Sequence, residues 1–94
     1  MTLYRFLFQA DVSKAEIEAS LLLAFIAVEG LHGESQARLD AGQTNLGSLG
    51  VCVLDASTPV GRDLAKVFTA LIRREFGEDS FRVERLQPNQ PQPH

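Results

Sequence analysis

The sequence predicts a single α+β domain, and three observations support this fold class. Several short segments alternate apolar and polar side chains with period two, as half-buried strands do. Two longer segments repeat apolar residues at the spacing of a helix face, and each begins with a capping signal. The chain of 94 residues is long enough for one domain. We expect residues 1–86 to form this domain and the Pro/Gln-rich residues 87–94 to form a disordered tail.

The first strand and the first helix follow from local patterns. Residues 3–10 alternate, and their aromatic side chains fall on the side that faces the core. Ser13 and Glu16 form a capping box that predicts the start of a helix. The helix is expected to run to about Glu29, with Gly30 as the residue that ends it.

The rest of the chain predicts three further strands and a second helix. A second strand is expected over residues 35–40, and the glycine-rich residues 41–49 read as a hairpin loop. Residues 50–54 form a continuous apolar run, which is typical of a central strand buried on both faces. The second helix is expected over residues 59–76 and the last strand over residues 81–86.

The resulting element order is β-α-β-β-α-β, the split βαβ pattern. It predicts a ferredoxin-like βαββαβ sandwich, in which a four-stranded antiparallel sheet has the strand order 4-1-3-2 and two helices cover one face. In this topology the turn that follows the first helix lies at the same end of the sheet as the start of the second helix.

The first helix carries apolar residues on two opposite sides. One side is expected to face the core: Ile17, Leu21, Ala24, Phe25 and Val28. The other side, here named the outer stripe, consists of Ala15, Ala19, Leu22, Leu23 and Ile26. A helix that is apolar all round is normally buried, so we expect a homodimer, a higher homo-oligomer or a protein partner to cover the outer stripe. In the alternative, the second helix leans over part of the stripe and the rest is a tolerated apolar patch.

Two other surfaces are candidates for binding. One side of the second helix carries a basic stripe of Arg62, Lys66 and Arg73. This stripe binds acidic groups of a partner or an anion, or in the alternative it only faces solvent. The uncovered face of the sheet is a second candidate interface, with these apolar residues expected on it: Leu3, Leu7, Cys52, Leu54 and Leu86.

The best candidate for a ligand site is the junction between the third strand and the second helix. Hydroxyls, free N–H groups at a helix N-terminus and an arginine can together bind an anion or another small ligand. The candidate set is His32, Asp55, Ser57, Thr58, Gly61 and Arg62. In the alternative, these residues only cap and pack the helix. Their spacing specifies no nucleophile and base, so no catalytic residue is assigned and we expect a binding protein rather than an enzyme.

Composition excludes several other classes. The net charge of −3 argues against nucleic-acid binding, and the third strand lacks the aromatic residues on which RNA-recognition domains stack bases. With one cysteine and two distant histidines, neither a disulfide, a metal site nor a cofactor is expected. The longest apolar stretch, residues 21–28, is too short to span a membrane, and the first residues do not resemble a signal peptide. A cytoplasmic protein is expected.

Overall fold

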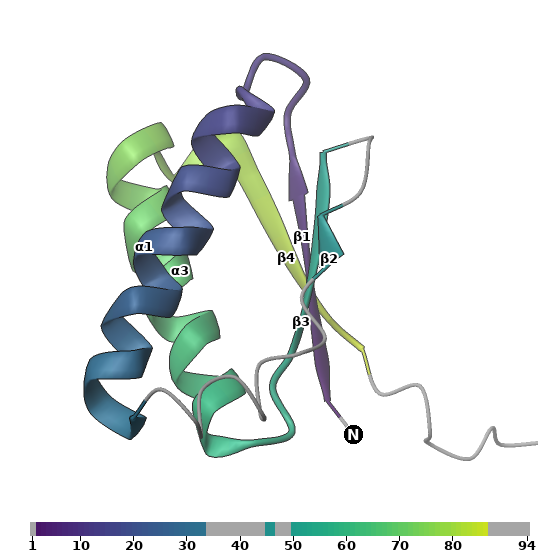
Figure 1. Ribbon diagram of the computed structural model, residues 1–94. Helices are drawn as coiled ribbons and strands as arrows, with labels where there is room; N and C mark the ends of the chain where they lie inside the picture. The colour runs from purple at the N-terminus through teal and green to yellow at the C-terminus, as the bar shows by residue number, and fades with distance from the viewer. Residues whose placement is uncertain (1, 34–44, 47–49, 87–94) are drawn as a thin grey trace, which may run out of the picture.

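Two helices lie side by side on one face of an antiparallel sheet (Figure 1). The computed structural model describes residues 2–33, 45–46 and 50–86. Its elements are, in chain order, β1 (Leu3–Phe8), α1 (Lys14–His32), β2 (Asn45–Leu46), β3 (Val51–Asp55), α3 (Pro59–Phe76), a short 3-10 helix (Glu78–Ser80) and β4 (Phe81–Leu86). The protein therefore has an α+β fold.

The sheet corrects the predicted ferredoxin-like sandwich. Three strands of five or six residues make up the body of the sheet, in the order β3-β1-β4. Next to β3 lies β2, a strand of only two residues, so the described sheet lacks the full fourth strand that a ferredoxin-like sandwich requires. The predicted strand over residues 35–40 lies outside the described residues.

The residues that do pair with β3 fall in the stretch predicted as a loop. Asn45 lies opposite Val53, and Leu46 lies opposite Cys52. The remainder of the predicted loop, and the predicted tail over residues 87–94, lie outside the part of the chain that the structure describes.

Strand pairing decides which side chains face the helices. Phe6 of β1 lies opposite Cys52 of β3 and opposite Val83 of β4, so these three side chains share one face. Cys52 and Leu54 are buried on this face, and their predicted place on the open face is wrong. The expectation that β3 is buried on both faces is also wrong, because its alternate residues are only half-buried and a single layer of helices covers the sheet.

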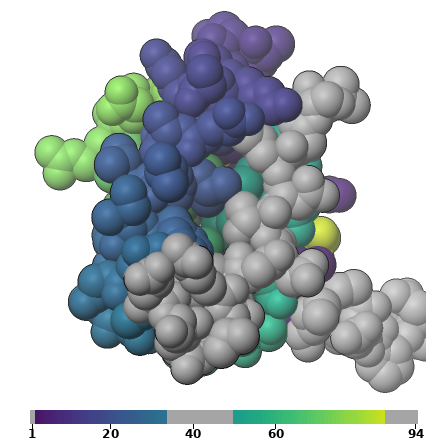
Figure 2. All heavy atoms as spheres, viewed as in Figure 1, coloured from purple at the N-terminus to yellow at the C-terminus, as the bar shows by residue number. Residues whose placement is uncertain are grey.

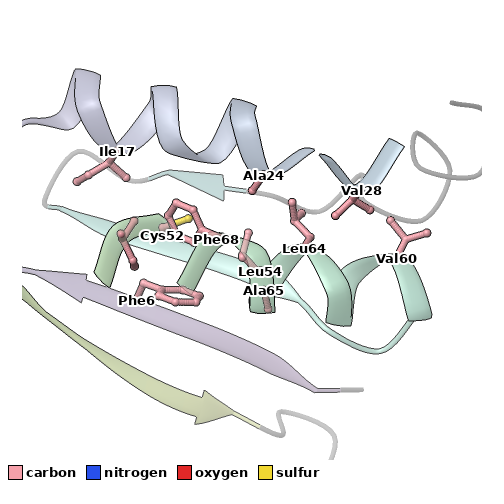
Figure 3. Close-up of a cluster of buried hydrophobic side chains, with 11 residues drawn as sticks. Phe6, Ile17, Ala24, Val28, Cys52, Leu54, Val60, Leu64, Ala65 and Phe68 are labelled. Carbon is pink, nitrogen blue, oxygen red and sulfur yellow. The ribbon is translucent and has the colours of Figure 1, made fainter. Parts of the chain in front are cut away.

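Phe68 of α3 is the centre of the core (Figure 3). It is fully buried, and its ring meets that of Phe6 edge-on with centroids 5.1 Å apart. Its ring also lies 6.4 Å from that of Phe8. Around it pack the buried face of α1, which includes Ile17 and Val28, and the inward residues of β3. The expected core face of α1 is confirmed.

Both helices begin at the predicted residues, but only α3 ends where expected. The Ser13 hydroxyl accepts the N–H of Glu16, which confirms the predicted cap of α1. This helix continues through Gly30 to His32 and ends at Gly33, which has a φ of +87°. The predicted stop at Gly30 is therefore wrong. Glycine is unfavourable inside a helix by only about 1 kcal/mol, and tertiary packing of the helix overrides such a cost.

No helix within the described ranges is long and apolar enough to cross a membrane.

We predict that Phe68→Ala lowers the free energy of unfolding by about 3–5 kcal/mol, because it leaves a cavity in the core between the two helices and the sheet. Leu31→Ala is the matched control, since Leu31 is 71% exposed and its truncation is expected to change stability by less than about 0.5 kcal/mol. Urea denaturation measures both. Equal losses in the two variants would contradict this description of the core.

Candidate functional site

The outer stripe of α1 is exposed to solvent in the single chain. Leu22, Leu23 and Ile26 are 60%, 58% and 53% exposed, and the two alanines of the stripe are exposed as well. The space-filling view shows α1, in blue, at the surface of the molecule (Figure 2). α3 therefore does not lean over these three side chains. That the stripe is a tolerated apolar patch stays an alternative prediction, which this exposure does not test.

The spacing of the outer stripe is that of a helix-pairing seam. Ala15, Ala19, Leu22 and Ile26 follow one another at intervals of four, three and four residues, the spacing with which helices pair in coiled coils. Leu31 is also 71% exposed, but it follows Leu22 by nine residues and therefore lies on the opposite side of the helix, outside the outer stripe.

The junction between β3 and α3 uses its own polar groups. One carboxylate oxygen of Asp55, Oδ1, accepts the backbone N–H of Ser57 at 2.9 Å and the Ser57 hydroxyl at 2.6 Å. The Thr58 hydroxyl caps α3 by accepting the N–H of Gly61 at 3.0 Å. Both donors of Ser57 and the N–H of Gly61 are thus bonded within the turn, and the Asp55 carboxylate adds a negative charge beside them.

Gly61 allows close contact between α3 and the end of β3. A Cβ atom at this position would lie 2.0 Å from the carbonyl oxygen of Asp55, far inside contact distance. Gly61 is itself buried, so it serves packing and leaves no space for a ligand to approach the backbone.

His32 is directed at Asp63, a partner that the sequence prediction did not assign to the site. Its Nε2 lies 2.7 Å from Oδ2 of Asp63. His32 is in the last turn of α1 and Asp63 is five residues after the cap residue of α3, so the contact joins the end of one helix to the beginning of the other. The sequence features that could have predicted this contact are a histidine near the end of one helix and an acidic residue near the start of the other.

His32 and Ser57 of the candidate set do not contact each other. Across the described ranges, no hydrogen bond links these two residues, and the Ser57 hydroxyl donates to the carboxylate of Asp55. The serine–histidine pair of an activated nucleophile is therefore not seen in the described residues. Arg62 lies beside Ser57 in one hollow, which Tyr4 and Arg85 also line, and it lines a second hollow with Tyr4 and Lys66.

Cys52 is not a reactive thiol. Its side chain is fully buried in the core, and burial raises the pKa of the thiol to about 11. The thiolate that reacts with electrophiles or binds metals is therefore scarce at neutral pH. The described residues contain no group of three or more metal-ligating side chains.

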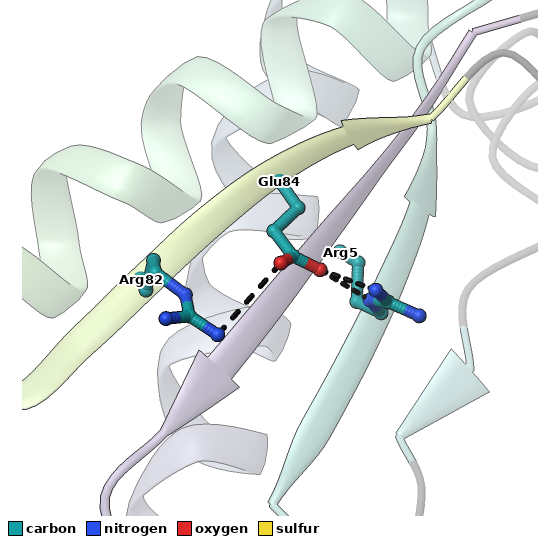
Figure 4. A network of polar contacts seen from close by, with 3 residues as sticks. All are labelled: Arg5, Arg82 and Glu84. Carbon is teal, nitrogen blue, oxygen red and sulfur yellow. Dashed lines mark hydrogen bonds and ion pairs between the residues drawn. The ribbon is translucent and has the colours of Figure 1, made fainter.

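The open face of the sheet carries an ion pair at its centre (Figure 4). The Arg5 guanidinium donates from Nε to Oε1 of Glu84 at 2.8 Å, and Arg82 approaches Oε2 of the same carboxylate at 3.7 Å. Leu3 and Leu7 flank this network and are half-buried. The open face is thus more polar than the outer stripe of α1.

Comparison of the chain with known protein families, with characterised proteins and with solved structures finds no match.

We predict that Gly61→Ala destabilises the protein by about 3 kcal/mol, because the new methyl group forces the backbone of α3 away from that of β3. Gly30→Ala is the control. Gly30 lies inside α1 with no atom within 4 Å of an added Cβ, so this change is expected to be neutral or to stabilise the helix by up to about 1 kcal/mol. Urea titration compares the two variants, and equal stability would contradict the packing role of Gly61.

Cys52 also predicts a pH dependence of stability. Its pKa is raised from 9.0 to about 11 in the folded protein, so the unfolded chain loses the thiol proton first as the pH rises. The free energy of unfolding is therefore unaffected by this group below pH 9 and falls between pH 9 and about pH 11. Urea denaturation should show a steeper fall over this interval in the wild type than in Cys52→Ala. Parallel curves would contradict the burial of the thiol.

Proposed function

We propose that this protein is a self-associating module that forms a homodimer through the outer stripe of α1. The observation that carries the proposal is the exposure of Leu22, Leu23 and Ile26, each more than half accessible in the single chain. Burying such side chains stabilises an assembly by roughly 1.5–3 kcal/mol each when burial is complete. Monomeric proteins rarely leave an apolar surface of this kind contiguous and uncovered.

A second copy of the chain is the occupant that fits the stripe best. The N-terminal half of the stripe is small, with Ala15 and Ala19, and the C-terminal half is large, with Ile26. An antiparallel pair of α1 helices centred near Leu22 sets Ala19 against the partner's Ile26, and the same contact recurs on the other side of the two-fold axis. Small against large is the arrangement in which side chains interdigitate, and a two-fold interface requires such self-complementarity.

The size of the surface indicates a weak dimer. α1 has 19 residues and is about 28 Å long, so one pair of helices buries less than the roughly 1,200–2,000 Å² of a standard interface. Association also costs several kcal/mol of translational and rotational freedom. We therefore expect a dissociation constant in the micromolar range or above, and a dimer fraction that increases with concentration.

An anion site built on the donors of Ser57 and the first turn of α3 is the less favoured alternative. It would need free donors at the start of α3, and the hydroxyl and N–H of Ser57 both bond to Asp55. The open face of the sheet is the less favoured interface, because the Arg5–Glu84 pair at its centre would lose solvent on association.

Sedimentation over a micromolar to millimolar concentration range tests the proposal. We predict a reversible monomer–dimer equilibrium for the wild type. Leu22→Glu should abolish it, because the substitution places a charge in the middle of the apolar seam. Leu7→Glu introduces the same charge on the open face of the sheet and should leave the equilibrium unchanged.

Two results would overturn this assignment. A wild-type chain that stays monomeric throughout the range has no self-association to explain. A dimer that survives Leu22→Glu and is lost in Leu7→Glu assembles through the sheet. Circular dichroism of each variant establishes that it remains folded.

A further inference from the structure

We propose that the groove between α3 and β4 binds a small organic phosphate ester. This site is separate from the outer stripe of α1, and the proposal does not depend on dimer formation. It rests on the shape of the groove, on the strand register that forms its floor, and on the charges that line it.

The groove consists of two adjoining hollows that share Tyr4 and Arg62. One is about 330 Å³ and extends along α3 past Lys66 to Arg73. The other is about 370 Å³; Ala56 and Ser57 line it at the end of β3, and Arg85 lines it from β4. Each hollow lies at the lower end of the range found for small-molecule sites, which is roughly 300–1,000 Å³.

The sheet register explains why the groove exists. Tyr4 of β1 lies opposite Arg85 of β4, and Tyr4 also lies opposite Leu54, whose side chain is buried under the helices. Tyr4 and Arg85 therefore belong to the face that the helices cover. The helices do not extend fully over β4, because Val83 on this same face is still 39% exposed. The uncovered strip beside α3 forms the floor of the groove.

Positive charge is concentrated around this strip. Four of the nine Lys and Arg residues of the chain line the two hollows, and no Asp or Glu of the described ranges is among the lining residues. An adjacent acidic group is the Asp55 carboxylate, which accepts the hydroxyl of the lining residue Ser57. The protein as a whole has a net charge of −3, so this is a local reversal of sign. Arg73 approaches Glu78 at 3.4 Å. Arg62, Lys66 and Arg85 make no ion pair with any residue in the described ranges.

A row of charged residues on one helix usually only faces solvent. The cations of the groove differ because they come from two opposite walls. Arg62, Lys66 and Arg73 lie four and seven residues apart on one side of α3. Arg85 comes from β4, at the opposite wall. An anion seated over Tyr4 is therefore within reach of cations from two elements, and the charge repulsion among the cations decreases when it binds.

The residues that line the groove fit a ligand with an anionic group at one end and an apolar group at the other. Guanidinium groups match the oxygens of a phosphate with paired hydrogen bonds, and an ammonium group adds charge. The ring of Tyr4 and the small side chains of Ala65 and Ala70 provide an apolar surface beside them. A phosphate monoester with an apolar or aromatic body fits this combination better than a free inorganic anion.

Titration of the full chain with phenyl phosphate tests the proposal. Amide chemical shifts locate the binding site, and calorimetry measures the affinity. We expect saturable shifts at Tyr4, Lys66 and Arg85, and binding at least about tenfold tighter than that of inorganic phosphate. Arg62→Gln and Lys66→Gln should each weaken binding of phenyl phosphate by about tenfold. Arg74→Gln removes the same charge from an α3 residue outside the lining and should leave the affinity within about twofold.

Three results would overturn the proposal. The absence of saturable binding removes the site. An equal loss of affinity in Arg74→Gln and Arg62→Gln shows only general attraction to a basic helix. Equal affinity for inorganic phosphate and phenyl phosphate shows that the apolar floor is not used. Repeating the titration on Leu22→Glu separates this site from dimer formation, and unchanged affinity is the expected result.

Discussion

The edge-on contact between Phe68 of α3 and Phe6 of β1 is the interaction on which the other features depend. It fixes the face of the sheet that the helices cover. Because side chains alternate along a strand, the same contact places Tyr4 beside α3 and leaves Arg5 on the opposite, open face. The groove with its basic walls and the open face with its ion pair are both consequences of this one orientation.

A single layer of helices also explains the exposed surface of α1. This helix uses Ile17, Ala24 and Val28 to close the core, and nothing in the described structure lies over its other side. Its outer stripe could be predicted from sequence, because the periodic spacing of apolar residues along a helix depends only on neighbouring residues and is visible on a helical wheel. The bounds of α3 were predictable for the same kind of reason, since Pro59 marks its start and Gly77 its end.

Features that depend on register and on distant pairing could not be predicted. The apolar run of β3 gives no sign of which residues face the helices, so Cys52 was placed on the wrong face. The pairing of Asn45 with Val53 occurs in a stretch whose glycines predicted a loop. The contact of His32 with Asp63 joins two helices, and the groove requires Arg85 to lie opposite Tyr4. None of these relations leaves a periodic signal in the sequence.

Disulfide cross-linking is the most direct test of the proposed antiparallel pairing. In the proposed pair, Leu22 would lie near the two-fold axis, so Leu22→Cys is expected to bring two thiols within the Cα separation of about 4.4–6.8 Å that a disulfide needs. The buried Cys52 does not compete, because its pKa is raised to about 11. We predict rapid oxidation of Leu22→Cys to a covalent dimer, and slow oxidation of Glu75→Cys on the exposed surface of α3. Equal rates for the two variants would contradict dimer formation through α1.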